Sequence, residues 1–255
     1  MSSKKEKLLK SMEGTTYLKI IKFNRVTSTN DIAHRLAEKG AREITVVWAK
    51  GQTKGRGRRG RKWNSPYSKG LYVSFVFRPQ AEARKLNLLG MAIALAVIYA
   101  LRDIIPVKIK WPNDILCGKK KIGGILVESK VSLHHPDYVI VGLGLNINNL
   151  LKELPASATS IFIETKRKYS LDKIFNLILK EVIIWYRHFK KKDYTEIAQR
   201  ASENLDTLGK KVVVYTEKKV IKGTAYKIGK DARLYVRSDG NGVKRIFASS
   251  VVHLR

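Results

Sequence analysis

The chain has 255 residues, with 51 Lys or Arg against 21 Asp or Glu, so its formal net charge at pH 7 is +30. This length supports one sizeable core and a small second domain, and the charge favours acidic partners such as nucleic acid, nucleotides or an acidic protein. The single cysteine, Cys117, excludes an intrachain disulfide, and the longest apolar run, residues 88–101, is shorter than the roughly 20 residues that cross a bilayer. The N-terminus lacks a signal-type apolar stretch, so we expect a cytoplasmic protein without a membrane span.

The first part of the chain is predicted to be rich in strands. Residues 2–13 are predicted to form a short basic helix. Ser28, Thr29 and Asn30 precede an apolar i, i+4 stripe, which predicts a helix with hydroxyl and amide groups at its N-terminus. A long apolar helix is predicted over residues 85–102. Alternating or apolar runs predict strands at residues 18–23, 44–50, 71–77, 107–111, 115–117, 122–131 and 139–146.

The character of the chain changes in its last third. Residues 171–188 and 194–204 have helical spacing, and from residue 209 onward short alternating runs are separated by Gly, Asp and Asn turns. We therefore predict an α+β domain over residues 1–207, with a mixed sheet backed by helices. A small barrel is predicted over residues 208–255.

The most informative segment is the loop over residues 51–63, which reads GQTKGRGRRGRKW. Its glycines let the backbone approach a ligand closely, and guanidinium groups at Arg56, Arg58, Arg59 and Arg61 suit carboxylate or phosphate oxygens. Two simpler interpretations are a solvated charge run and a disordered nucleic-acid-binding tail. The position between two strand-like runs favours an anion-binding loop.

Four other features have a simple interpretation when each is taken alone. The hydroxyls and amide of residues 28–30 (STN) suit a plain helix N-cap, and residues 110–114 (KWPND) suit a Pro-Asn turn. Residues 119–121 (KKK) suit a solvated hairpin turn, and Gly142 and Gly144 suit bulges in a strand. None of them predicts a function alone.

In their order and spacing, however, STN, GQTKGRGRRGRKW, KWPND, KKKIGGILVE and VGLGLNIN resemble the catalytic module of biotin protein ligase, also called holocarboxylase synthetase. The resemblance spans roughly residues 26–149, and GRGRRGRKW matches the family signature GRGRxxRxW at every fixed position. It implies a class II synthetase-like catalytic domain followed by an SH3-like barrel. Members that double as repressors carry a winged helix-turn-helix before this module. The short segment that precedes it here implies the monofunctional type without DNA binding.

The resemblance implies an ATP-dependent enzyme that activates biotin as biotinyl-5′-AMP and transfers it to a lysine of a biotin carboxyl carrier protein. Arg56, Arg58 and Lys121 are the implied catalytic cations, and Asp114 is the implied Mg²⁺ contact. The residues implied for biotin binding are Ser28, Thr29, Asn30, Gln52, Gly55, Arg56, Lys121, Gly124, Leu126, Gly142 and Gly144. The residues implied for nucleotide binding are Arg58, Arg61, Trp63, Asn113, Lys121 and Asn146.

The same resemblance implies a homodimer, with residues 139–146 as an edge strand, and an acidic carrier domain as partner. No His shows metal-ligand spacing with Cys117, so we expect no transition metal. Two alternatives stay open. A lipoate or octanoate ligase of the same fold carries a different Arg-rich, Gly-Gly-Gly signature. A basic nucleic-acid-binding protein is disfavoured because the loop region offers only Trp63 and Tyr67 as stacking platforms.

Overall fold

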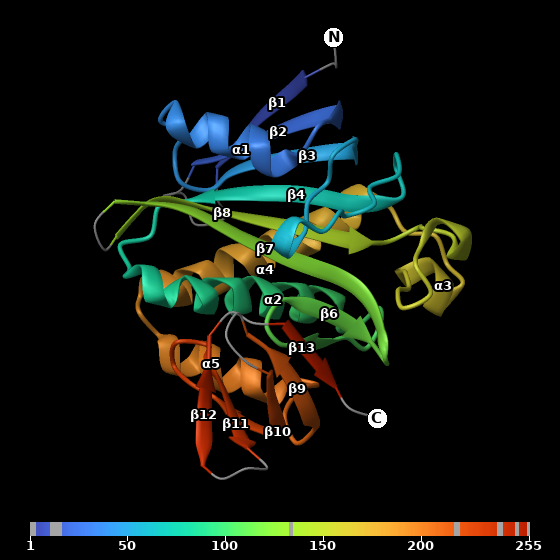
Figure 1. Ribbon diagram of the computed structural model, residues 1–255. Helices are drawn as coiled ribbons and strands as arrows, with labels where there is room; N and C mark the ends of the chain where they lie inside the picture. The colour runs from blue at the N-terminus through green and yellow to red at the C-terminus, as the bar shows by residue number, and fades with distance from the viewer. Residues whose placement is uncertain are drawn as a thin grey trace. The chain divides into compact units, whose positions relative to one another are not determined.

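The computed structural model describes residues 4–10, 17–132, 135–216, 220–238, 242–247 and 250–253 (Figure 1). The chain divides into two compact units. The first contains Met1–Ala83 and Lys119–Asn176, and the second contains Arg84–Gly118 and Leu177–Arg255.

A mixed sheet forms the centre of the first unit. Its strands follow the order β1-β2-β3-β4-β8-β7. The pair β2/β3 is parallel and the other pairs are antiparallel, which confirms the predicted mixed sheet. Every residue of β4 is buried, as its apolar sequence GLYVSFVF requires. The strands are β1 (Lys4–Lys10), β2 (Tyr17–Val26), β3 (Thr45–Gln52), β4 (Gly70–Phe77), β7 (Lys120–Ser132) and β8 (His135–Asn146).

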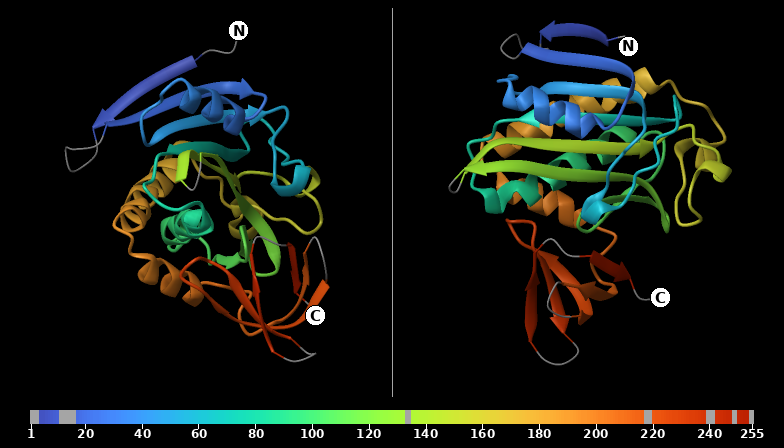
Figure 2. Two further views of the ribbon diagram at one scale, coloured as in Figure 1. Left: turned by 60° about the vertical axis from the view of Figure 1, so that its left-hand side comes forward. Right: turned by 45° about the horizontal axis from the view of Figure 1, so that its top comes forward.

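Helix α1 (Thr29–Glu38) covers one face of this sheet, as Figures 1 and 2 show. Its Ala33 and Ala37 pack against Val47 of β3 and Ile140 of β8. Successive side chains of a strand point to opposite faces, so Trp48 points away from α1. It stacks on Phe175 of α4 (Leu171–Lys190), with 4.6 Å between the ring centroids. The short helix α3 (Ile161–Thr165) completes this unit.

The second unit contains α2 (Leu86–Leu101), the antiparallel pair β5 (Lys108–Lys110) and β6 (Asp114–Cys117), the later part of α4, and α5 (Tyr194–Glu203). Its C-terminal strands form an antiparallel sheet in the order β12-β11-β10-β9-β13, which confirms a small sheet at the predicted place. These strands are β9 (Lys211–Tyr215), β10 (Val220–Ile228), β11 (Leu234–Ser238), β12 (Val243–Ile246) and β13 (Ser250–His253).

The apolar helix predicted over residues 85–102 is confirmed as α2. The segment Ala83–Leu101 is long and apolar enough to cross a membrane by length and composition alone, but 72% of its most apolar stretch is buried inside the structure. Such burial is what a core helix of a globular protein requires.

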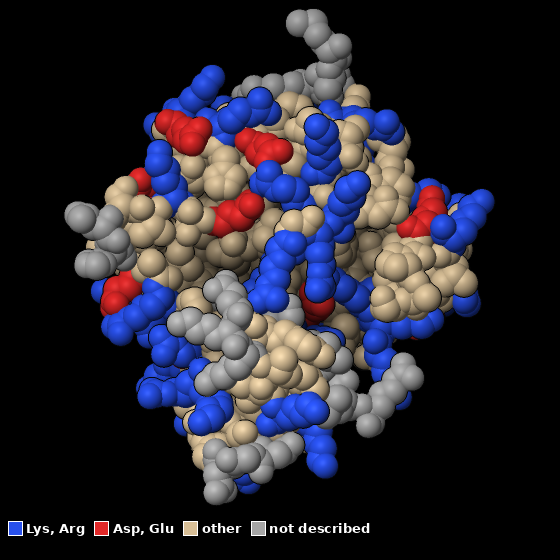
Figure 3. Space-filling view, viewed as in Figure 1, with Lys and Arg blue, Asp and Glu red and all other residues tan. Residues whose placement is uncertain are grey.

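The charged side chains lie at the surface, where Lys and Arg dominate the face shown in Figure 3.

Two sequence-based predictions are wrong. Residues 4–10 form strand β1 on β2 instead of belonging to a basic helix, and the rest of that predicted helix lies outside the described residues. A helix so short is marginal in water, whereas the open edge of β2 offers a row of backbone partners. The second error is the prediction that residues 139–146 form an edge strand. Strand β8 pairs with both β4 and β7, so it is an interior strand.

Candidate active site

The floor of the site is formed by small residues of β7 and β8. Gly124 lies opposite Gly144, and Leu126 lies opposite Gly142. Residues directly opposite each other in an antiparallel pair share a face of the sheet. Since Ile140 of β8 packs against α1, these four residues lie on the α1 face. The structure thus brings together the residues predicted to surround the biotin ring system.

Two side chains lie directly on this floor. A Cβ atom at Gly142 would lie 2.3 Å from the Asn30 side-chain oxygen, and one at Gly144 would lie 2.5 Å from the Trp63 ring. Real Cβ contacts below 3.0 Å essentially do not occur. The glycines are therefore required because Asn30 and Trp63 approach the strand backbone closely.

The start of α1 supplies buried polar groups beside this floor. Ser28 is only 2% exposed, and although it occupies the N-cap position its hydroxyl makes no capping hydrogen bond. Both the backbone N–H and the hydroxyl of Thr29 donate to Gln52 Oε1, at 2.8 and 3.1 Å. Gln52 Nε2 in turn donates to Ser65 Oγ at 2.9 Å. The STN segment is therefore tied to both ends of the basic loop, which a plain N-cap would not require.

The basic loop itself is folded as a small hairpin. The Trp63 N–H donates to the Gly55 carbonyl at 2.9 Å, and the Gly57 N–H donates to the Arg61 carbonyl at 2.7 Å. At its tip is the short 3-10 turn η1 (Arg58–Gly60). A Cβ atom at Gly55 would lie 2.5 Å from the Trp63 carbonyl oxygen, so only glycine fits there. This ordered geometry agrees with an anion-binding loop and differs from a disordered tail.

Lys121 of β7 and Trp63 of the loop meet over the glycine floor. The Lys121 ammonium lies 5.4 Å from the Trp63 ring centroid, and it lies 3.4 Å from the position of a Cβ atom at Gly124. Its backbone is fixed on both sides, because the Lys121 N–H donates to the Ser157 carbonyl and its carbonyl accepts from the Thr159 N–H, each at 2.9 Å. A cation of β7 and an aromatic ring of the basic loop, which are distant in the sequence, therefore meet on the glycine floor.

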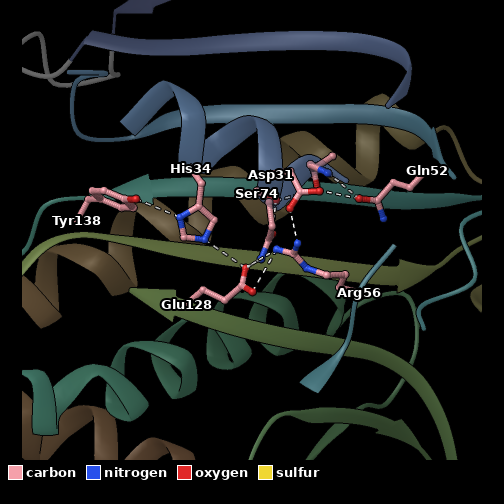
Figure 4. Close-up of polar contacts among 9 residues, drawn as sticks. Asp31, His34, Gln52, Arg56, Ser74, Glu128 and Tyr138 are labelled. Carbon is pink, nitrogen blue, oxygen red and sulfur yellow. Dashed lines mark hydrogen bonds and ion pairs between the residues drawn. The ribbon is translucent and has the colours of Figure 1, made fainter. Parts of the chain in front are cut away.

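A polar network continues from the loop along the α1 face (Figure 4). Arg56 pairs with Asp31 of α1 through Nη1 and with both carboxylate oxygens of Glu128 of β7 through Nη2, at 3.2 Å each. Glu128 also accepts from Asn30 Nδ2 at 2.5 Å and lies 3.4 Å from His34 Nε2. Burial raises the pKa of Glu128, but the bonds from His34 and Asn30 and the charge of Arg56 outweigh it and lower the pKa from 4.5 to about 2. Glu128 is therefore ionised at neutral pH.

Comparisons with known proteins agree with this geometry. Residues 22–146 match the model of the biotin/lipoate A/B protein ligase family. The bifunctional ligase/repressor BirA of Bacillus subtilis is 30% identical over 91% of this chain and 73% of its own length. The biotin–[acetyl-CoA-carboxylase] ligase of Mycobacterium tuberculosis is 30% identical over 89% of this chain and 86% of its own. The chain belongs to the biotin protein ligase family.

A solved structure of that family has the same fold. The biotin protein ligase of Aquifex aeolicus in complex with biotin and ATP superposes with a TM-score of 0.80 at 31% identity, over 92% of this chain and 99% of the other. The mixed α/β fold of the biotin protein ligases is thereby shown for this chain.

The remaining residues predicted to bind the nucleotide and Mg²⁺ differ in burial and in their contacts. Arg58 is half-buried and Arg61 is exposed, both near the tip of the loop. Asn146 is buried, and its side chain donates to the Thr159 carbonyl at 3.0 Å. Asp114 is the first residue of β6 and directly follows Asn113. Both belong to the second unit, so their nucleotide and Mg²⁺ roles stay predictions.

Sequence reasoning missed four polar residues of this biotin protein ligase site. Ser74 lies in the middle of the buried strand β4, and it donates to Thr29 Oγ1 or Asn30 Oδ1, at 2.7 and 2.5 Å. The sequence signal that could have indicated Ser74 is its position as a lone hydroxyl residue in an apolar run. Glu128 follows Gly124 and Leu126 at period two, which places it on the same face of β7. The other two missed residues are Asp31 and His34.

Proposed function

We propose that this chain is an ATP-dependent ligase that activates biotin as biotinyl-5′-AMP and transfers the biotinyl group to a lysine of a biotin carboxyl carrier protein. One observation carries the proposal. Three side chains from separate segments meet on the glycine floor: Asn30 of the STN segment at Gly142, Trp63 of the basic loop at Gly144, and Lys121 at Gly124. The family membership and the biotin and ATP named for the Aquifex aeolicus complex support the same conclusion.

The buried polar groups at the start of α1 suit the ureido ring of biotin. That ring has two N–H donors and one carbonyl acceptor. Ser28, Thr29 and Gln52 supply hydroxyl and amide groups that can donate and accept at the edge of the floor. A buried site that hydrogen-bonds its substrate rejects analogues that leave those groups unpaired. The glycine floor then receives the fused sulfur ring, with Leu126 beside it.

The first reaction step joins two anions. An oxygen of the biotin carboxylate attacks the α-phosphorus of ATP, and the bond to pyrophosphate breaks. Positive charge near the reacting groups reduces their repulsion and stabilises the charge that develops on the transferring phosphoryl group. We assign this task to Lys121, which is fixed above the floor, and to Arg58, which lies in the same loop as Trp63.

The second step transfers the acyl group. The neutral lysine amine of the carrier attacks the acyl carbon of biotinyl-5′-AMP, and AMP leaves as the acyl–phosphate bond breaks. Because the intermediate is a mixed anhydride, it must be shielded from water. Trp63 and the basic loop lie over the floor, where they can exclude solvent. Positioning of the two substrates supplies much of the rate.

Magnesium enters with the ATP phosphates. Among the residues that the structure describes, no group of three or more His, Cys, Asp or Glu side chains could hold a metal ion. Protein sites for Mg²⁺ commonly supply only one or two carboxylates and leave the other positions to phosphates and water, so a single Asp114 carboxylate fits. Bound there, the ion would neutralise phosphate charge. We also assign the nucleotide contacts to Asn113, Asn146 and Arg61.

Three finer features belong to this proposal. The C-terminal strands close into an SH3-like barrel, so the functional boundary lies between residues 207 and 208. The enzyme is a cytoplasmic homodimer. Its carrier domain is acidic, and the excess of Lys and Arg on the surface speeds the encounter by electrostatic steering (Figure 3).

A two-stage assay tests the function. Purified protein is given labelled biotin, ATP and Mg²⁺, and pyrophosphate release is followed by label transfer to a carrier domain. Lipoate is supplied in a parallel reaction. We expect both stages with biotin. Activation of lipoate without activation of biotin would overturn the proposal in favour of a lipoate ligase.

A further inference from the structure

The outward face of the C-terminal sheet carries aromatic and basic side chains together. Tyr235 of β11 lies opposite Lys227 of β10 and opposite Arg245 of β12. Residues directly opposite each other share a face of the sheet, so these three side chains lie on one side. Arg237 lies two residues beyond Tyr235 and belongs to the same face, whereas the intervening Val236 is buried on the inner face.

The aromatic rings on this face have cations beside them. Tyr226 of β10 is 38% exposed. The Arg237 guanidinium lies 5.3 Å from the centroid of the Tyr226 ring, and the Tyr235 ring lies 6.4 Å away in an edge-on arrangement. The Lys227 ammonium lies 5.9 Å from the centroid of the Tyr235 ring. These are the distances of cation–π and edge-to-face pairs, so rings and charges form one continuous surface.

The positive charge of this surface is not balanced by its own strands. The described strands β9 to β12 contain no Asp or Glu, unlike the active site, where two carboxylates pair with Arg56. Residues 208–255 contain 12 Lys or Arg against 3 Asp or Glu. Such an excess attracts a polyanion. By strand register, this aromatic–basic surface consists of Tyr226, Tyr235 and the exposed cations Lys211, Lys222, Lys227, Arg237 and Arg245.

One end of the aromatic–basic surface opens into a hollow of about 540 Å³. Lys227 and Tyr235 line this hollow together with Lys85, which precedes α2, and with Gln199 and Ser202 of α5. The ammonium, amide and hydroxyl groups of these side chains suit phosphate oxygens and base edges. The surface therefore offers flat rings for stacking and a polar recess beside them.

We propose that the aromatic–basic surface binds single-stranded nucleic acid, with bases stacked on Tyr226 and Tyr235 and phosphates held by the surrounding cations. Every base has a flat π face, so binding of this kind does not depend on sequence. Aromatic rings set among basic residues are what such proteins combine, and the C-terminal sheet supplies the rings that the basic loop lacks. An acidic protein would use the cations alone. This activity is separate from the activation of biotin.

Fluorescence anisotropy with labelled oligo(U) of about 12 nucleotides measures the binding to the whole protein, and oligo(dT) of the same length is the DNA arm. The logarithm of the association constant should fall linearly with the logarithm of the salt concentration, with a slope of roughly −2 to −3.5 for three to five phosphate contacts. Binding of either oligomer supports the proposal, and the relative affinity identifies the sugar. Binding of neither at about 0.05 M salt overturns it.

Two substitutions separate stacking from charge. Tyr226→Leu keeps an apolar side chain but removes the flat ring, so the affinity should fall roughly 10-fold. Arg237→Gln should make the salt slope shallower by roughly 0.7, because one phosphate contact is lost. Tyr67→Leu is the matched control, since Tyr67 is 43% exposed with Arg25 and Lys50 at 5.7 and 5.9 Å from its ring centroid but belongs to the first unit. It should leave the affinity unchanged.

An abasic oligonucleotide of the same length tests the stacking in the wild-type protein itself. It carries the phosphates without the bases, so it should bind roughly 10-fold more weakly than oligo(U) or worse. Equal affinity for the two oligomers overturns the proposal in favour of an acidic protein partner attracted by charge alone. A loss of affinity in Tyr67→Leu together with none in folded Tyr226→Leu also overturns it, because the binding site would then lie in the first unit.

Discussion

The lowered pKa of Glu128 predicts how the folding stability of the protein depends on pH. Its pKa is lowered from 4.5 to about 2 in the folded protein. A carboxylate with a lowered pKa stabilises the folded state above its unfolded pKa, and that contribution is lost as pH falls toward the folded pKa. The stability advantage of the wild type over Glu128→Gln should therefore shrink between pH 6 and pH 3.

The size of the expected stability change follows from the size of the pKa shift of Glu128. A fall of the pKa from 4.5 to about 2 corresponds to about 3 kcal/mol at neutral pH, of which about 2 kcal/mol is lost by pH 3. The side chain of Glu128 is 29% exposed, so solvent screening reduces this contribution. We expect the difference in free energy of unfolding between the two proteins to fall by about 1–2 kcal/mol.

Urea titrations at several pH values measure this difference. Both proteins are unfolded at pH 6, 5, 4 and 3, with circular dichroism as the probe and equal m-values as the check on a common transition. Groups that do not interact with Glu128 titrate alike in both proteins, so their effects cancel in the difference. A difference that stays constant from pH 6 to pH 3 would refute the reasoning, because it would mean that Glu128 gains nothing from His34, Asn30 and Arg56.

Other substitutions test the remaining roles. Lys121→Met should slow biotin-dependent pyrophosphate release by roughly 10²-fold to 10³-fold in kcat, with an unchanged circular dichroism spectrum. Thr29→Val should raise KM for biotin roughly 10-fold in steady-state assays and leave kcat near the wild-type value, because it removes a ground-state hydrogen bond. Gly144→Ala places a Cβ atom 2.5 Å from the Trp63 ring, so a shifted tryptophan emission spectrum and a KM for biotin at least about 10-fold higher are expected. Biotin transfer to the carrier should slow as NaCl rises from about 0.05 to 0.5 M, measured at low carrier concentration, while pyrophosphate release changes less.

The parts of the site that were predictable from sequence are local. A glycine-rich basic loop between two strands, hydroxyls before a helix, and glycines inside an apolar strand each carry their own signal. Period-two alternation also places Gly124 and Leu126 on one face, once their strand is recognised. The predicted mixed sheet, α1, α2, α4 and α5 are confirmed for the same reason, since each depends on a regular apolar pattern.

The parts that were not predictable depend on pairing between distant segments. Nothing near Glu128 in the sequence indicates Arg56 or Asp31, because their contacts arise when α1, the loop and β7 meet. Strand order is set in the same way. The apolar run of residues 139–146 suits an edge or an interior strand, and only pairing with β4 and β7 decides between them. Residues 4–10 likewise form a strand because β2 offers an edge.

The most direct test of the account is biotin-dependent exchange of labelled pyrophosphate into ATP by the wild-type protein. This reaction reports formation of biotinyl-5′-AMP in the absence of a carrier. The account predicts exchange that requires biotin and Mg²⁺, and that falls by roughly 10²-fold or more in Lys121→Met. Absence of exchange with biotin in the folded wild-type protein, or an unchanged rate in Lys121→Met, would contradict the claim that the loop and Lys121 form an adenylation site.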